Sequence, residues 1–413
     1  MQTEEYFPIP TKLWNKNFVK FMVAYESLYF GYFTMIFAIP LYILTATGSP
    51  AALASAMALA GLPRVAVGLV SGVVADRYNK RKILICGYML TTFSILLYLL
   101  FMGRLPLVPA ATAVILVLMG VDAFLMPSLE GSIPRLVPDG SMQRATSAIS
   151  SISVMSMIAA PMLAGFIFGR RGIAPVLVLA ACLYGLAMIF ALLYKFPYTK
   201  QKHKQDLLHS IVPDMKKAIQ YSTKENSTFI KITLLFFLVS IAISPVFTVG
   251  FMAIGSSYMG ISHAALGTAM SVGQVGGVVG PMITYALGGR VHIQRMRLFF
   301  FIPALALAGI GLVLMYTTAQ AQLVLFVASF FVIQLSFAAV MPIIWSYFGE
   351  NSPPDMVGKI MSLAMMFSFL GMSIGEFAWG QLLGRFIEAP WVALFAAAGL
   401  SVLVSVFAKI RVK

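Results

Sequence analysis

Charged residues are scarce in this chain. Asp, Glu, Lys and Arg make up only 10% of its 413 residues, whereas soluble domains carry about 25%. Apolar residues, at 60%, are too numerous to be covered by polar groups in a water-facing globule of this size. The shortage of charge therefore excludes an ordinary soluble fold and indicates that the solvent is lipid.

Cysteine and histidine are also rare. The two cysteines, Cys86 and Cys182, lie within apolar runs, which argues against a structural disulfide. The four histidines fall in loops or at helix ends, where they offer no haem ligand, zinc site or proton relay inside the membrane. The glycine-rich run 273–281 lacks the Lys-Ser/Thr of a phosphate loop and predicts close helix packing or a hinge. We expect no metal and no cofactor.

Long apolar runs separated by polar breaks predict an all-α integral membrane fold. Strand-like alternation is absent, and each span with its connector uses about 34 residues, so we expect twelve helices. The runs place these helices at residues 18–45, 51–75, 82–102, 108–131, 145–168, 173–195, 230–254, 263–288, 298–317, 321–348, 357–385 and 390–409. The long polar segment 196–229 divides the chain into an N-terminal six-helix bundle, 1–195, and a C-terminal one, 230–413.

The basic residues predict the orientation. A net charge of +15 would suggest nucleic acid in a soluble protein, but here it fits the retention of positive loops in the cytoplasm. With the N-terminus inside, 24 of the 29 lysines and arginines fall in cytoplasmic segments and four on the other side. We expect a multi-pass protein of a bacterial-type inner membrane, with both termini cytoplasmic and no nucleic-acid partner.

The two halves share a sequence echo. Met126-Pro127 recurs as Met341-Pro342, a shift of 215 residues that also carries Arg144 to Lys359 and Ser147 to Ser362. Related halves are typical of transporters whose substrate site lies between them near the membrane midplane. The alternative is that helix ends in general share proline and basic residues.

One loop carries a specific motif. After the second helix the chain reads Gly72-Val-Val-Ala-Asp76-Arg77-Tyr-Asn79-Lys80-Arg81-Lys82. This resembles motif A of the major facilitator superfamily, with Asn79 in place of a glycine, and we expect Asn79 to take the left-handed turn. The resemblance implies a gate in which Asp76 meets the N-terminus of the eleventh helix and Gly72 allows close packing. Arg77, Lys80 and Arg81 also serve the orientation signal.

The resemblance extends to the drug-efflux branch of that superfamily, which includes macrolide exporters and the enterobactin exporter. It rests on Leu13-Trp14-x-x-x-Phe18, Leu62-Pro63, the segment from Met126 to Ala145 and the central segment 211–230. In the fifth helix, Ala160-Pro161-Met-Leu-Ala164-Gly165 resembles the antiporter motif G-P-x-x-G-G, with alanine at two glycine positions. The branch implies export of a drug or siderophore type of solute in exchange for protons.

Four ionisable residues lie deep inside the expected spans, where each costs about 2.5–3.5 kcal/mol: Glu26, Arg64, Asp122 and Glu376. The first three fall at a similar depth, about 12–18 Å from the inner helix ends, so two carboxylates and one guanidinium can share a patch. We expect one acid to be held by Arg64 and the other to titrate, because burial favours the neutral acid and a guanidinium favours the charged one. A purely structural ion pair is the alternative. Glu376 is a second titrating candidate.

A cavity for hydrophobic solutes needs apolar, aromatic and adaptable walls. The candidates, in the first helix and in the second half, are Tyr25, Tyr29, Tyr32, Gln274, Gln334, Trp345 and Trp379. The three tyrosines lie near Glu26 without all sharing a face. Glu130 and Glu350 lie near inner helix ends, and we expect both to be interfacial.

Together these features predict a secondary transporter that acts as a monomer and exports a hydrophobic or amphipathic small molecule by proton-coupled alternating access. A lipid or lysolipid translocator and a metabolite carrier of the same fold stay open. A membrane enzyme is disfavoured, because no nucleophile with His or carboxylate partners gathers at one membrane face.

Overall fold

The computed structural model describes residues 11–194, 213, 216–217, 219–225, 227–287, 296–316, 319–353 and 356–407, without the side chains of residues 69, 72, 73, 76, 77, 225, 296–298, 319 and 320. The regular structure in these ranges is helical throughout. The helices of the first half are α1 (Lys16–Thr47), α2 (Pro50–Arg77), α3 (Lys80–Phe101), α4 (Leu107–Glu130), the short η1 (Ile133–Arg135), α5 (Met142–Arg171) and α6 (Ile173–Leu193).

The second half begins with a short π-helical turn, η2, and continues with long helices. Its elements are η2 (Tyr221–Glu225), α8 (Ser227–Ala242), η3 (Val246–Gly250), η4 (Ala253–Tyr258), α9 (His263–Leu287), α10 (Met296–Tyr316), α11 (Ala319–Asn351), α12 (Val357–Arg385) and α13 (Trp391–Phe407). Each of the twelve predicted spans corresponds to one of these helices, or to α8 with η3 and η4, within a few residues. The predicted fold class is confirmed.

The described helices have the length and surface of membrane spans. Eleven are long and apolar enough to cross a bilayer, and α13 is a shorter apolar helix of 17 residues. Large apolar side chains stay exposed on the outside of the bundle, such as Leu100 at 71% and Phe407 at 72%. In contrast, 61% of the most apolar 18-residue stretch is buried in both α1 and the Ser227–Gly250 span. These two are therefore inner helices.

Local sequence signals set the start of the first two helices. Asn15 caps α1, because its side-chain oxygen accepts hydrogen bonds from the backbone N–H groups of Asn17 and Phe18. α1 ends at Gly48, whose φ of +64° is the left-handed conformation that glycine adopts without strain. Ser49 then caps α2, and Pro50 occupies its first turn, where a missing N–H costs nothing.

The seventh span is not one regular α-helix. α8 ends at Ala242, and the π-helical segments η3 and η4 continue the span to Tyr258. Pro245 lies between α8 and η3. Proline has no N–H and its ring clashes with the preceding turn, so the regular ladder of hydrogen bonds cannot pass through it.

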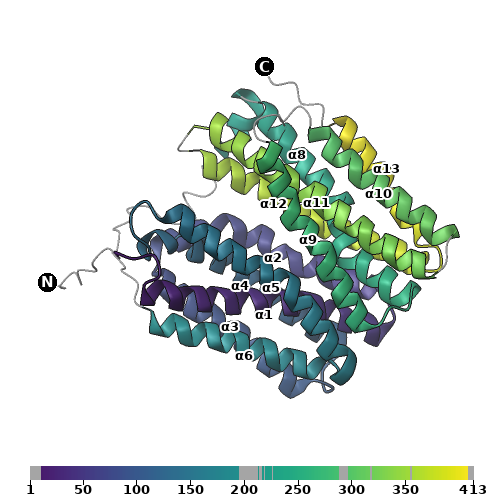
Figure 1. Ribbon diagram of the computed structural model, residues 1–413, viewed down its shortest axis with the longest axis horizontal. Coiled ribbons are helices and arrows are strands. Elements are labelled where there is room, and N and C mark those ends of the chain that lie inside the picture. Colours follow the sequence, from purple (N-terminus) through teal and green to yellow (C-terminus); the bar gives the residue numbers. More distant parts are fainter. Residues whose placement is uncertain are drawn as a thin grey trace.

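The helices of each half pack mainly with one another. In Figure 1 the purple-to-teal α1–α6 fill one side of the molecule and the green-to-yellow α8–α13 the other. The sides meet mainly through two helix pairs, α2 with α12 and α5 with α9, and α2 also contacts η3. We call the end of the bundle where α1 begins and α2 ends the basic end, because Lys16, Lys20, Lys80 and Arg81 lie there, and the other end the opposite end.

Helix contacts between the two sides are tightest toward the opposite end. A Cβ atom built on Gly380 of α12 would lie 1.9 Å from the Cβ of Ala54 in α2. On the other pair, a Cβ on Gly267 of α9 would lie 2.4 Å from the carbonyl oxygen of Pro161 in α5. Nearer the basic end, a Cβ on Gly68 of α2 would meet nothing within 4 Å. The two sides thus touch at one end and leave space toward the other.

Candidate functional site

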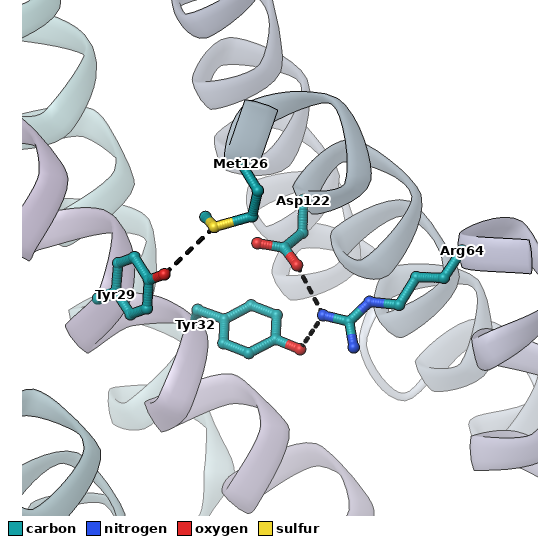
Figure 2. A network of polar contacts seen from close by, with 5 residues as sticks. All are labelled: Tyr29, Tyr32, Arg64, Asp122 and Met126. Carbon is teal, nitrogen blue, oxygen red and sulfur yellow. Dashed lines mark hydrogen bonds and ion pairs between the residues drawn. The ribbon is translucent and has the colours of Figure 1, made fainter. Parts of the chain in front are cut away.

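An ion pair lies inside the N-terminal group of helices. One guanidinium nitrogen of Arg64 lies 2.6 Å from the Asp122 carboxylate, and the side chains are only 16% and 12% exposed. The same nitrogen donates a hydrogen bond to the Tyr32 hydroxyl, so Arg64 joins α2, α4 and α1 (Figure 2). The guanidinium also lies 5.5 Å from the ring centre of Phe369 on α12, within the range of a cation–π contact.

The packing of α2 on α4 explains why this pair forms. A Cβ on Gly120 would lie 3.4 Å from the Cβ of Pro63, so the two helices run close together at this level. Arg64 follows Pro63, and Asp122 lies two residues after Gly120. Their side chains therefore start near one another, and the charges satisfy each other in a place where either alone would be costly.

The three tyrosines of α1 form one stripe, so the expectation that they do not share a face is wrong. The rings of Tyr25 and Tyr29 stack at 4.8 Å and 15°, and the Tyr29 hydroxyl donates to the Met126 sulfur at 3.2 Å (Figure 2). Tyr32 follows one turn later and faces Arg64. Spacings of four and then three residues bring side chains to one side of an α-helix.

Glu26 faces another way. It accepts a hydrogen bond from the Ser156 hydroxyl on α5, and it makes no ion pair with Arg64. One residue along an α-helix turns the side chain by about 100°, so Glu26 leaves the tyrosine stripe and points toward α5. The shared patch expected from depth alone therefore forms for Arg64 and Asp122 but leaves Glu26 outside it.

Glu376 is fully buried on α12. Its side chain is 0% exposed, and Oε1 accepts a hydrogen bond from the Thr248 hydroxyl at 3.1 Å. Oε2 has no hydrogen-bond partner within the described ranges. Thr248 belongs to η3, so this carboxyl joins α12 to the irregular part of the seventh span.

Two cavities adjoin the ion pair. The smaller, of about 270 Å³, is lined by Leu28, Tyr29, Tyr32, Arg64, Asp122 and Met126. The larger, of about 650 Å³, shares Arg64, Asp122 and Met126 and extends between α2, α4, α11 and α12 toward the basic end. Its wall contains residues from both sides of the molecule, such as Glu130 on α4 and Met361 on α12.

Of the seven predicted cavity residues, Tyr25 stacks on Tyr29 and lines neither cavity, and the other six divide into two groups. Tyr29 and Tyr32 line the smaller cavity and Trp345 lines the larger one. The Gln334 side chain donates to the Gln274 side chain between α11 and α9, and Trp379 is buried against Gly250. These last three positions belong to helix interfaces rather than to either cavity. Polar or aromatic character alone does not reveal which face of a helix meets a cavity.

The larger cavity is also lined by residues that were not predicted from the sequence. They include one carboxylate and several methionines of α12. Glu130, which is expected to be interfacial, is exposed at the end of α4 and also lines this cavity. On α12 the lining residues are Met361, Ser362, Met365, Met366 and Phe369. Their spacing follows the helical repeat, which was the available signal.

The motif A loop joins α2 to α3. The side chains of Gly72, Asp76 and Arg77 lie outside the described part, so the gate contact stays a prediction. Asn79 does not take the expected left-handed turn, because its φ is −65°. It caps α3 instead, with its side-chain oxygen accepting from the backbone N–H groups of Arg81 and Lys82.

Basic residues at the basic end donate hydrogen bonds to the end of a neighbouring helix, α6. The Arg81 guanidinium donates to the carbonyl of Ala191 at 3.0 Å and also to that of Leu192. The Lys20 ammonium donates to the carbonyl of Leu193 at 3.1 Å. These are the last carbonyls of α6, which lack partners within the helix and favour cations. Lys80 lies against Gly131, where a Cβ would be 2.7 Å from its Cε.

The antiporter-like segment lies at the contact of α5 with α9. Ala160 and Ala164 are fully buried. A Cβ on Gly165 would lie 2.4 Å from the carbonyl oxygen of His263, and one on Gly267 would lie 2.4 Å from that of Pro161. Only small residues allow two helix backbones to approach this closely.

The glycine-rich run of α9 packs in the same manner against α11. A Cβ on Gly276 would lie 2.2 Å from the carbonyl oxygen of Phe331, and one on Gly280 would lie 2.3 Å from that of Leu335. Close helix packing, one of the two roles predicted for this run, is confirmed.

Comparison with known proteins identifies relatives at low identity. The model of the Major Facilitator Superfamily matches residues 21–376. Macrolide efflux protein A of Streptococcus pyogenes is 22% identical over 342 residues, which cover 82% of each chain. An uncharacterized MFS-type transporter of Bacillus subtilis, YfiS, is 25% identical over 342 residues, covering 79% of this chain and 78% of that one.

Solved structures share the architecture. The nucleoside transporter NupG superposes with a TM-score of 0.74 at 15% identity, covering 95% of this chain and 98% of the other. At this identity the likeness concerns the fold, and the solute must be argued from the cavities.

Proposed function

The chain belongs to the major facilitator superfamily of membrane transporters, and on that premise we propose that it exports a hydrophobic or amphipathic small molecule in exchange for protons. The observation that carries this proposal is the cavity of about 650 Å³ beside the Arg64–Asp122 pair, with walls from both sides of the molecule. A concave, largely apolar site with a few polar groups is the usual form of a small-molecule site. The macrolide efflux proteins among the relatives support export of drug-like solutes.

The positive residues at the basic end support a cytoplasmic location for that end, with both termini inside the cell. On that orientation the larger cavity extends toward the cytoplasm, where an exporter loads its solute. Transport then requires the two six-helix units, 1–195 and 230–413, to rock so that the opposite end separates and the basic end closes. A monomer provides both units.

Three carboxyls inside the helical bundle, of which Glu376 is buried and Glu26 and Asp122 are partly buried, are candidates for the coupling proton. Asp122 is held by Arg64, Glu26 is bonded to Ser156, and Glu376 has one oxygen without a partner among the described residues. A charged carboxylate is costly in an apolar environment. Protonation of the carboxyl therefore lowers the free-energy barrier to the change between the inward-open and outward-open conformations. We assign Arg64 as the group that holds Asp122 charged until a proton or solute arrives.

A drug-susceptibility panel in a host without its own efflux pumps tests this function. Expression of the wild-type chain should raise the inhibitory concentration of at least one hydrophobic drug about fourfold or more. Asp76→Asn and Glu26→Gln should each remove that protection, because the first weakens the predicted gate and the second a predicted proton site.

The control for expression is Lys82→Gln, which alters an exposed residue next to the motif A positions. Its protection should match that of the wild type. If no compound in the panel shows a change, the lipid or metabolite carrier becomes the better assignment.

A further inference from the structure

Among the side chains that the structure describes, the larger cavity is lined by more negative than positive charge. Its charged lining residues in this described part are Arg64, Asp122 and Glu130. Arg64 and Asp122 neutralise each other at 2.6 Å. Glu130 is exposed at the end of α4, and within the described ranges it has neither an ion pair nor a side-chain hydrogen bond. One carboxylate in the cavity is therefore available to a ligand.

The wall around this carboxylate is soft and polarizable. Met126 comes from α4, and Met361, Met365 and Met366 come from one face of α12. Trp345 and Phe369 add two aromatic rings. Thioethers adapt to irregular apolar shapes, and aromatic faces attract cations. Such a surface suits an apolar body that carries a positive charge.

Lys80, a lysine that lies close to the end of α4, does not pair with Glu130. Lys80 approaches Gly131, the residue after Glu130, yet it forms no ion pair with the carboxylate. Lys80, Arg81 and Lys82, the described basic side chains at the start of α3, do not line the cavity. Salt screens charges separated by more than about 8 Å. The unpaired carboxylate inside the cavity thus has the stronger influence on a bound ion.

We propose that the larger cavity is a binding site for lipophilic monovalent cations, with Glu130 as their counter-ion and the methionine and aromatic wall as their apolar contact. This inference rests on the proposed export function, since it specifies the class of solute that the exporter takes. Anionic solutes, which the surrounding positive loops would attract, are the opposite outcome of the test.

Tetraphenylphosphonium and tetraphenylborate provide the sharpest probes, because they share one shape and differ in the sign of their charge. The dissociation constant of each ion is measured by calorimetry with the purified full chain in a neutral detergent. The ratio of the two constants is compared among variants, so that partition of the ions into the micelle cancels. Glu350→Gln is the matched control, because Glu350 is an exposed carboxylate near the end of α11 and bonds to Ser346 outside the cavity.

In the wild type and in Glu350→Gln we expect the same preference for the cation. Glu130→Gln should reduce that preference about tenfold, equivalent to about 1.4 kcal/mol, and Glu130→Lys should shift it further toward the anion. An unchanged ratio in both Glu130 variants, a wild-type preference for the anion at the cavity, or no binding of the cation overturns the inference. Each variant must first match the wild type in melting temperature.

The binding assay needs no ion gradient, so it separates this inference from the proposed function. Cation binding that depends on Glu130, in a chain that transports nothing, would contradict export but not the site. Export of uncharged compounds with an unchanged ion preference would contradict the site but not export.

Discussion

At the scale of single residues, the Arg64–Asp122 pair is held by several contacts at once. Its two side chains are largely removed from solvent, and Tyr32 bonds the same guanidinium. Removing one partner of such a pair leaves an uncompensated buried charge and costs about 3–5 kcal/mol, whereas removing both costs much less. The residual exposure of 16% and 12% places the expected cost near the lower limit.

This difference predicts a thermal signature. Arg64→Ala should lower the melting temperature of the purified protein in detergent more than Arg64→Ala combined with Asp122→Asn, because the double variant has no unpaired carboxylate. The measurement is a double-mutant cycle. Melting temperatures are compared among the wild type, the two single variants and the double variant.

Tyr32→Phe is the control variant, because it keeps the ring in place and removes only the hydroxyl that accepts a hydrogen bond from Arg64. It should cost less than Arg64→Ala. If the single and double variants lose stability additively, the two groups are not coupled and the assigned role of Arg64 is wrong.

The sequence was sufficient to predict that Arg64 and Asp122 share a layer, because depth follows from residue counts along each helix. It was not sufficient to exclude Glu26 from the patch, because rotation about the helix axis depends on how α1 packs against α5. The part of Glu130 in the cavity wall was missed for the same reason. Its position near a helix end gave depth, but only the placement of α12 revealed that it lines a cavity.

At the scale of helices, the contacts of small residues determine where the two sides of the molecule meet. Gly267 on α9 faces Pro161 and Gly165 on α5, with distances from its would-be Cβ of 2.4 Å to a carbonyl oxygen and 3.2 Å to a Cα. Backbone atoms cannot move aside as a flexible side chain can. An added methyl group must therefore push the two helices apart.

Gly267→Ala should shift the protein toward the conformation in which the opposite end is open. The added methyl group costs about 1–3 kcal/mol in the conformation where α5 and α9 touch and nothing in the conformation where they are apart. The ratio of the two conformations therefore changes about tenfold for each 1.4 kcal/mol. Thr47 and Ser257 are exposed at the opposite end, one on each side of the molecule. Pulsed electron paramagnetic resonance measures the distance between spin labels attached at these two positions. The exposed Cys86 and Cys182 must first be replaced by serine.

Gly277→Ala is the matched control on the same helix pair, because its Cβ would meet only the end of the Met157 side chain at 3.8 Å. Its distance distribution should equal that of the wild type. A Gly267→Ala distribution that also stays unchanged would contradict the assignment of this contact as the closure of the opposite end.

The helices themselves were the most predictable part of the structure. Long apolar runs fixed all twelve spans within a few residues, since a bilayer leaves few alternatives to a helix. Local exceptions were harder to predict. Pro245 made a break possible, but its continuation as π-helix depends on packing, and the role of Asn79 as a cap depends on where α3 starts.

At the scale of the whole molecule, one conformation of a transport cycle is present. Close contacts join the two sides at the opposite end, and the larger cavity lies between them toward the basic end. Under the proposed orientation and direction of transport, this is the state that loads the solute. The predicted contact of Asp76 with the start of α12 belongs to the other state, in which the basic end is closed.

The division into two rocking units was suggested by the echo of 215 residues between the halves. Pro127 and Pro342, one pair of that echo, lie inside α4 and α11 respectively. The echo predicts related helices, but it does not predict which pairs touch. Contacts of α2 with α12 and of α5 with α9 became evident only from the packed structure.

The central claim is that a proton gradient drives export, and everted membrane vesicles test it most directly. In these vesicles the cytoplasmic face is outside, and respiration acidifies the lumen. A compound identified by the susceptibility panel should accumulate in the lumen, and nigericin, which dissipates the pH gradient, should abolish the accumulation. Glu26→Gln or Asp122→Asn should abolish accumulation while leaving solute exchange without a gradient. Accumulation that survives nigericin, or full gradient-driven accumulation in both variants, would contradict the account.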